Sequence, residues 1–189
     1  MATMIETLHA APGADLVRAA DRSFARDCPY PGEAFRHHCH RLYRFADLLL
    51  ERDGLAFDRS TLYAIAMYHD LGLVNDTARG ATYMARSLDL FDREVGGLAA
   101  ATDERIIEEC LLLNHRVRPV RGVDRRAELF RRAVWVEHTR GFRRYGLDRA
   151  EVRAVFARHP RLDLDRVLLD FARRVLRREP VTILRGIFF

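Results

Sequence analysis

The segment that decides the fold reads Ala64-Ile65-Ala66-Met67-Tyr68-His69-Asp70-Leu71-Gly72-Leu73. Apolar residues precede His69 at helical spacing, and Gly72 lets the backbone turn away soon after Asp70. Asp58 or Ser60 is suited to begin this helix as its N-cap. The pattern predicts a helix that runs to His69 and ends on an imidazole and a carboxylate side by side.

The same spacing of apolar residues predicts helices along the remainder of the sequence. Apolar periodicity predicts further helices at residues 15–27, 33–53, 81–94, 103–115, 124–138, 149–158 and 163–178. Asp148 and Glu151 have the spacing of a capping box, and Gly54 is a stop signal for the helix before it. No β-alternation is sustained. We therefore expect one all-α domain over residues 1–189, a compact bundle of seven to nine helices.

Composition and charge restrict the classes of function. The chain is 49% hydrophobic and 31% charged with a net charge of +5, which fits a globular protein with small anionic partners. No basic run is interleaved with aromatic residues, so nucleic acid is not an expected partner. No apolar run reaches the roughly 20 residues of a membrane helix. The three dispersed cysteines and the absence of a signal peptide favour a cytoplasmic location, and a homo-oligomer remains open.

Several residues that bind metals in other proteins fall on the inner faces of predicted helices. At about 100° per residue, His38 lies beside an apolar stripe, whereas His37 and His40 point to the opposite side. His115 ends a helix one turn after apolar residues, and Glu137 lies on an apolar stripe. A buried carboxylate is costly unless a metal or an arginine accompanies it.

Each of these residues taken alone is more often a hydrogen-bonded or ion-paired core residue than a ligand. Their coincidence on separate helices favours a metal, because helical bundles hold metals with inward side chains from facing helices.

Two segments of the chain resemble the HD-domain superfamily. The first is His38-Cys39-His40-Arg41, with an arginine three residues after a histidine, and the second is the segment around His69-Asp70. The resemblance covers residues 33–140 and implies a helical HD core there, followed by C-terminal helices and an apolar tail over residues 141–189.

The resemblance implies that His38, His69 and Asp70 bind a divalent metal ion. Manganese, iron, cobalt, nickel and zinc all accept mixed histidine and carboxylate ligands. The family's remaining ligand is usually an aspartate on a later helix, where this chain has Val134. Glu137, one turn further on, is expected to replace it as a metal ligand. The alternative is that the site is weakened or lost.

Three functions are compatible with these residues. The leading hypothesis is metal-dependent hydrolysis of a small phosphorylated metabolite or nucleotide by a metal-activated water, with Asp70 and His115 as catalytic residues. Its candidate substrate-binding residues are Arg41, Arg79, Arg116 and Arg140, although a surface ion pair is the commoner role for each.

The second hypothesis is a hydratase or lyase similar to the cyanamide hydratase-like members, acting on a small nitrogen compound in an apolar pocket lined by Trp135 and Phe142. The third is a degenerate, non-catalytic HD fold used for binding, with the apolar tail Ile183 to Phe189 as its interface.

Overall fold

The computed structural model describes residues 7–99 and 103–182, and every regular element in these ranges is helical. The all-α prediction is confirmed, and each predicted helix is present with ends within two residues of those expected. The elements are α2 (Ala14–Asp27), α3 (Ala34–Asp53), α4 (Arg59–Tyr68), η1 (Leu71–Leu73), α5 (Tyr83–Glu94), η2 (Gly96–Leu98), α6 (Glu104–Leu113), α7 (Arg125–His138), α8 (Arg149–Arg158), α9 (Leu164–Arg178) and α10 (Pro180–Thr182).

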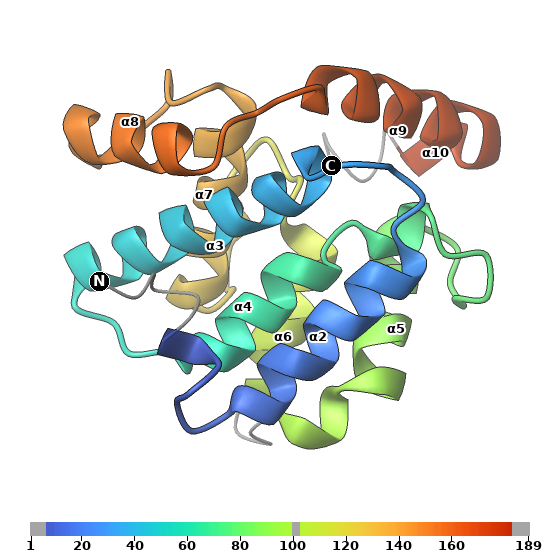
Figure 1. Cartoon of the computed structure of the whole chain (residues 1–189), viewed down its shortest axis with the longest axis horizontal. Helices are drawn as coiled ribbons and strands as arrows, with labels where there is room; N and C mark the ends of the chain where they lie inside the picture. The colour runs from blue at the N-terminus through green and yellow to red at the C-terminus, as the bar shows by residue number, and fades with distance from the viewer. Residues whose placement is uncertain (1–6, 100–102, 183–189) are drawn as a thin grey trace.

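Helix α3 crosses the middle of the molecule, with α8 and α9 above it, α7 behind it, and α2, α4, α5 and α6 below (Figure 1). It packs most extensively on α7 and α4, and α4 also packs on α2. Every residue of α4 from Ser60 to Tyr68 is buried. A helix that is apolar and buried on all sides lies within the core over its whole length. His69, the C-cap of α4, therefore lies in the interior.

The helix ends use the signals found in the sequence. The Asp58 side chain caps α4 by accepting a hydrogen bond from the backbone N–H of Thr61 at 2.7 Å. Asp148 and Glu151 form the predicted capping box of α8. Helix α3 ends at Gly54, whose φ of 65° is a left-handed conformation that glycine adopts at little cost. Local chemistry thus sets where these helices begin and end.

The end of the last long helix is attached to the middle of the chain. Glu179 is buried directly after α9, and its carboxylate accepts a hydrogen bond from the backbone N–H of Tyr83 at 2.9 Å. The same carboxylate pairs with Arg86. Because the first N–H groups of a helix lack partners within it, Glu179 satisfies one of them at the start of α5.

Two further expectations from the sequence concern the C-terminal tail and membrane-spanning segments. The apolar tail, Ile183 to Phe189, lies outside the described residues. None of the described helices combines the length and the apolar character needed to cross a bilayer.

Gly72 is the point of closest approach between η1 and α5. Its N–H donates to the Ser87 hydroxyl, which in turn donates to the carbonyl of His69. A Cβ at this position would lie 2.2 Å from the carbonyl oxygen of Tyr83 and 2.5 Å from the backbone nitrogen of Ser87. The missing side chain is what lets α5 pack directly behind the His69-Asp70 pair.

We expect Gly72→Ala to lower the free energy of unfolding by at least about 1–3 kcal/mol, because the new methyl group meets backbone atoms that cannot rotate away. Chemical denaturation measures the change. Gly97→Ala is the matched control, since a Cβ there meets no atom within 4 Å. Equal stability of the two variants would contradict the close-packing argument.

Candidate metal centre

Three of the predicted ligands meet in the interior. The Nε2 atoms of His38 and His69 are 3.1 Å apart. Oδ2 of Asp70 lies 3.2 Å from the Nε2 of His69 and 3.8 Å from that of His38. All three residues are buried, and their ligand atoms lie within 4.8 Å of one another. Helix α3 supplies one ligand and the end of α4 supplies the other two.

The outer partners of the two imidazoles favour a proton on Nδ1, most clearly in His69. Nδ1 of His69 lies 2.7 Å from the carbonyl oxygen of Ala66, which can only accept a hydrogen bond. Nδ1 of His38 lies 3.1 Å from Oε2 of Glu137, also an acceptor, although this ion pair is not aligned as a hydrogen bond. With both Nδ1 atoms protonated, both Nε2 atoms present lone pairs to the centre.

This arrangement fits a cation. Two imidazole lone pairs and a carboxylate oxygen facing one another repel unless a positive charge lies between them. Burial lowers the pKa of His38, but Glu137 and Asp70 outweigh burial and raise the pKa to about 9. Burial raises the pKa of Asp70, but His69, His115 and His38 hold it well below its ordinary value. A proton would satisfy the array, and so would a divalent ion that accepts nitrogen and oxygen ligands.

Glu137, expected as the fourth ligand, lies behind His38 and outside the group of convergent ligand atoms. Its Oε2 faces Nδ1 of His38, the ring nitrogen on the far side from the centre. Its Oε1 accepts from Nε and NH2 of Arg41 at 3.0 and 2.7 Å, and from NH1 of Arg161 at 2.9 Å. A carboxylate in this position orients a metal-binding histidine without touching the metal.

His115 and His138 border the centre on its more exposed side. Nε2 of His115 lies 3.1 Å from Oδ1 of Asp70, and the His115 side chain is 12% exposed. Nδ1 of His138 lies 3.2 Å from Oε2 of Glu137, and its side chain is 23% exposed. The ring centroids of the two histidines are 5.4 Å apart. The sequence analysis did not single out His138, although its position next to Glu137 was a signal.

The four candidate arginines lie in different surroundings, and two of them already pair with carboxylates. Arg41 is fully buried against Glu137, and Arg140 pairs with Asp165 at the surface. Arg79 lies in the exposed loop before α5, with its backbone N–H bonded to Asp89. Arg116 follows His115, and its carbonyl accepts hydrogen bonds from Trp135 and Arg131.

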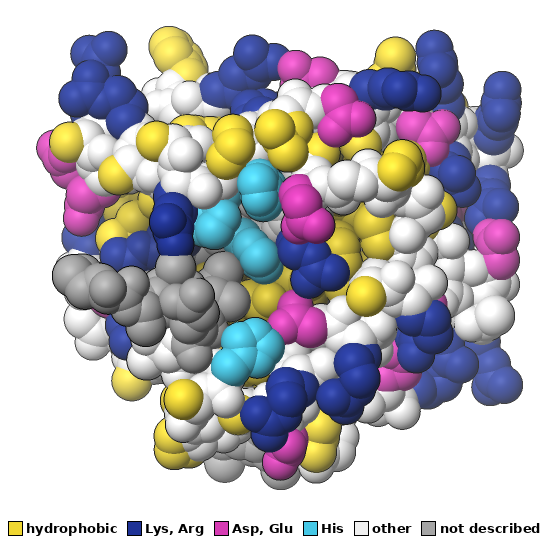
Figure 2. All heavy atoms as spheres, in the orientation of Figure 1, with side chains coloured by type: hydrophobic (Ala, Val, Ile, Leu, Met, Phe, Trp, Pro, Cys, Tyr) yellow, Lys and Arg dark blue, Asp and Glu magenta, His cyan; other side chains and the backbone are white. Residues whose placement is uncertain are grey.

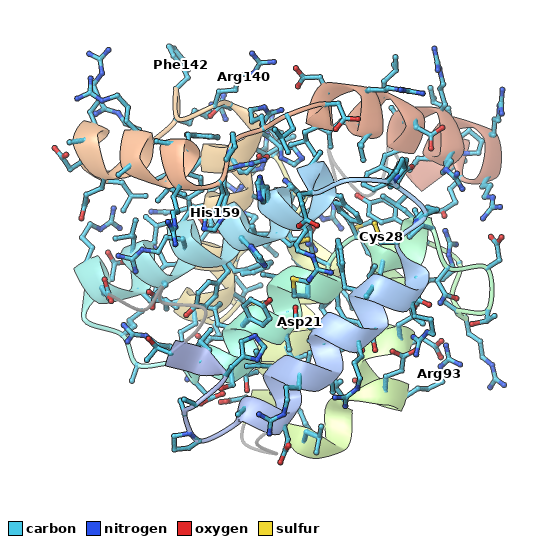
Figure 3. All side chains as sticks on the ribbon, in the orientation of Figure 1. Asp21, Cys28, Arg93, Arg140, Phe142 and His159 are labelled. Atoms are coloured by element: carbon cyan, nitrogen blue, oxygen red, sulfur yellow. The ribbon has the colours of Figure 1, made fainter. Side chains whose placement is uncertain are left out.

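Of the two residues expected to line an apolar pocket, Trp135 lies near the centre and Phe142 does not. The Trp135 ring lies 6.1 Å from that of His138, next to the centre. Phe142 is 89% exposed and projects from the α7–α8 loop at the edge of the molecule, so it does not line the centre (Figure 3). The expectation for Phe142 is wrong because the chain turns outward directly after α7, at Arg140 and Gly141, both with positive φ.

A second group of histidines lies on the surface, where Figure 2 shows imidazoles gathered in the middle of one face. The ring of His159 lies 5.6 Å from His37 and 5.2 Å from His40. Both are partly exposed while His38 is fully buried, as the helical periodicity predicts. Ligand atoms of this surface group do not converge as those of His38, His69 and Asp70 do within the described ranges.

Comparison of the chain with family models, curated proteins and solved structures gives no match. The HD resemblance therefore rests on the two sequence segments, and the interpretation of the centre rests on its own geometry.

His69→Ala and Asp70→Ala should each abolish binding of a divalent metal, because each removes one of the three ligand atoms that converge among residues 7–99 and 103–182. Elemental analysis of purified protein measures the metal content. His9→Ala, which alters a histidine paired with Asp21 at the surface, should leave that content unchanged. Stoichiometric metal in both His69→Ala and Asp70→Ala would refute the ligand assignment.

Glu137→Gln should weaken metal affinity by about 10- to 100-fold, because the carboxylate that orients His38 is lost. It should also cost about 3–5 kcal/mol of stability, since the buried guanidinium group of Arg41 loses its counter-charge and the half-buried Arg161 loses one of its two. Chelator competition and denaturation measure the two effects. Glu128→Gln, which breaks a buried pair with Arg131 elsewhere on α7, should reduce stability only. Unchanged metal affinity in folded Glu137→Gln protein would contradict the orienting role.

Proposed function

We propose that this chain is a metal-dependent hydrolase of the HD type that acts on a small phosphorylated metabolite or nucleotide. The observation that carries the proposal is the convergence of two Nε2 atoms and one carboxylate oxygen in the interior. Two imidazoles and one carboxylate leave coordination positions open for water and substrate. A divalent ion at this position would supply Lewis acidity and a water of lowered pKa.

The surrounding residues suit this chemistry. Nε2 of His115 contacts Oδ1 of Asp70, so the carboxylate is held in place while Oδ2 faces the two other ligands. His115 is also partly exposed, as a residue that exchanges protons with solvent must be. Water and substrate would approach from the side of His115 and His138, because the three ligands are otherwise enclosed.

The charged and aromatic residues near the centre bear on the class of substrate. A net charge of +5 supports an anionic substrate, and Arg116 adjoins His115 in the chain. Arg41 and Arg140 already pair with carboxylates, which argues against an arginine fork built from them. This observation favours a second candidate, hydration of a small neutral nitrogen compound. Tyr83 and Trp135, whose rings adjoin those of His115 and His138, would then border the substrate.

The test is an activity screen of the metal-loaded protein with two panels of substrates. The first panel contains nucleoside monophosphates and small phosphate esters, scored by phosphate release. The second contains cyanamide and small nitriles, scored by formation of the hydrated product. We expect turnover in the first panel that a chelator abolishes, that metal restores, and that Asp70→Ala lacks. His9→Ala serves as the active control.

Turnover confined to the second panel would replace the hydrolase by the hydratase. Inactivity on both panels, in protein that contains no metal when purified from metal-supplemented cultures, would overturn both enzymatic proposals and favour a binding protein.

A further inference from the structure

The segment between α8 and α9 is fastened to the helix that carries His38. NH1 of Arg41 donates to the carbonyl oxygens of His159 and Pro160 at 2.7 and 3.1 Å. Nδ1 of His37 lies 3.0 Å from the same Pro160 carbonyl. Figure 3 shows His159 beside α3, and Figure 1 shows the chain passing from α8 to α9 above that helix. The residue that follows, Arg161, is thereby brought to the end of α7.

Arg161 reaches the carboxylate that stands behind His38. Its NH1 donates to Oε1 of Glu137 at 2.9 Å, and its NH2 donates to Oδ1 of Asp165 at 2.8 Å. The Arg161 side chain is 16% exposed, whereas Glu137 is fully buried. One guanidinium group therefore connects a surface carboxylate with the carboxylate next to a predicted metal ligand.

Both guanidinium groups bind the same oxygen of Glu137. Oε1 receives donors from Arg41 on one side and from Arg161 on the other, which fixes the plane of the carboxylate. Oε2 is then left to face Nδ1 of His38 at 3.1 Å and Nδ1 of His138 at 3.2 Å. If Arg161 were absent, the carboxylate could turn toward Arg41 and away from the imidazoles.

The cost of burying Arg161 suggests that its role is more than stabilising the fold. Its Nε is buried and has no hydrogen-bond partner among the described residues. An unsatisfied buried donor is unfavourable, and such groups in folded proteins call for an explanation.

We propose that Arg161 is a positioning residue of the metal centre, which acts through Glu137 to orient His38. The inference rests on the proposed metal-binding role of His38. It adds the α8–α9 segment, which lies outside the HD-like residues 33–140, to the parts of the chain that build the centre. Arg161 does not touch the ion or the substrate in this role; it sets the direction in which the His38 imidazole presents Nε2.

The test compares metal affinity and thermal stability in four forms of the full chain. Zinc or cobalt affinity is measured by chelator competition for the wild type, Arg161→Gln, Arg161→Lys and Arg140→Gln. Arg140→Gln is the matched control, because Arg140 also pairs with Asp165, at 2.7 Å, but makes no ion pair with Glu137 within the described residues. We expect about 10-fold weaker binding in Arg161→Gln, substantial recovery in Arg161→Lys, and wild-type affinity in Arg140→Gln.

Wild-type affinity in folded Arg161→Gln protein, with only its stability reduced, would show that Arg161 merely attaches α8–α9 to the core. Tighter binding would also overturn the inference, because it would mean that removal of a nearby positive charge dominates. If Arg161→Gln fails to fold, Asp165→Ala serves instead, since it removes the acceptor of NH2 of Arg161 without emptying a buried position. A smaller loss of affinity is then expected, and wild-type affinity would count against the inference.

The two proposals fail in different ways. A wild-type protein that binds no metal refutes the proposed function, whereas metal binding that is indifferent to Arg161 refutes only its positioning role.

Discussion

The structure depends on one electrostatic constraint, the meeting of two imidazoles and a carboxylate face to face in the buried interior. A shared proton or a cation between His38, His69 and Asp70 would stabilise this arrangement. Their surroundings are organised accordingly. The Ala66 carbonyl and Glu137 hold the outer nitrogens, His115 holds the second oxygen of Asp70, and Gly72 allows α5 to close behind the pair.

Much of the fold could be predicted from the sequence because the signals are local. A period of 3.6 residues identified the helices, and capping residues such as Asp58 and Asp148 identified where they begin. Rotation by about 100° per residue separated His38 from His37 and His40 without any knowledge of the partners. The enclosed apolar sequence of α4 indicated that its last residues would be interior. Helical periodicity, capping and the face on which a residue lies are properties of a single segment, and tertiary packing left them unchanged.

The detailed chemistry of the centre was not predictable in the same way. Periodicity placed Glu137 on the inner face of α7 but could not tell whether its carboxylate would stand in front of His38 or behind it. That choice follows from Arg41 and Arg161, which lie 96 and 24 residues from Glu137 in the chain. Arg161 carried no signal, because an arginine after a proline in a polar loop is expected in solvent. The orientation of planar groups depends on such distant partners and has no counterpart in a hydrophobic pattern.

The bond between Glu179 and the start of α5 has a consequence for biosynthesis. A chain leaves the ribosome from its N-terminus, so α5 emerges before Glu179. The first turn of α5 stays without its carboxylate until the end of α9 has been translated. This contact between α5 and the end of α9 therefore forms only after the 96 residues that separate Tyr83 from Glu179 have been synthesised.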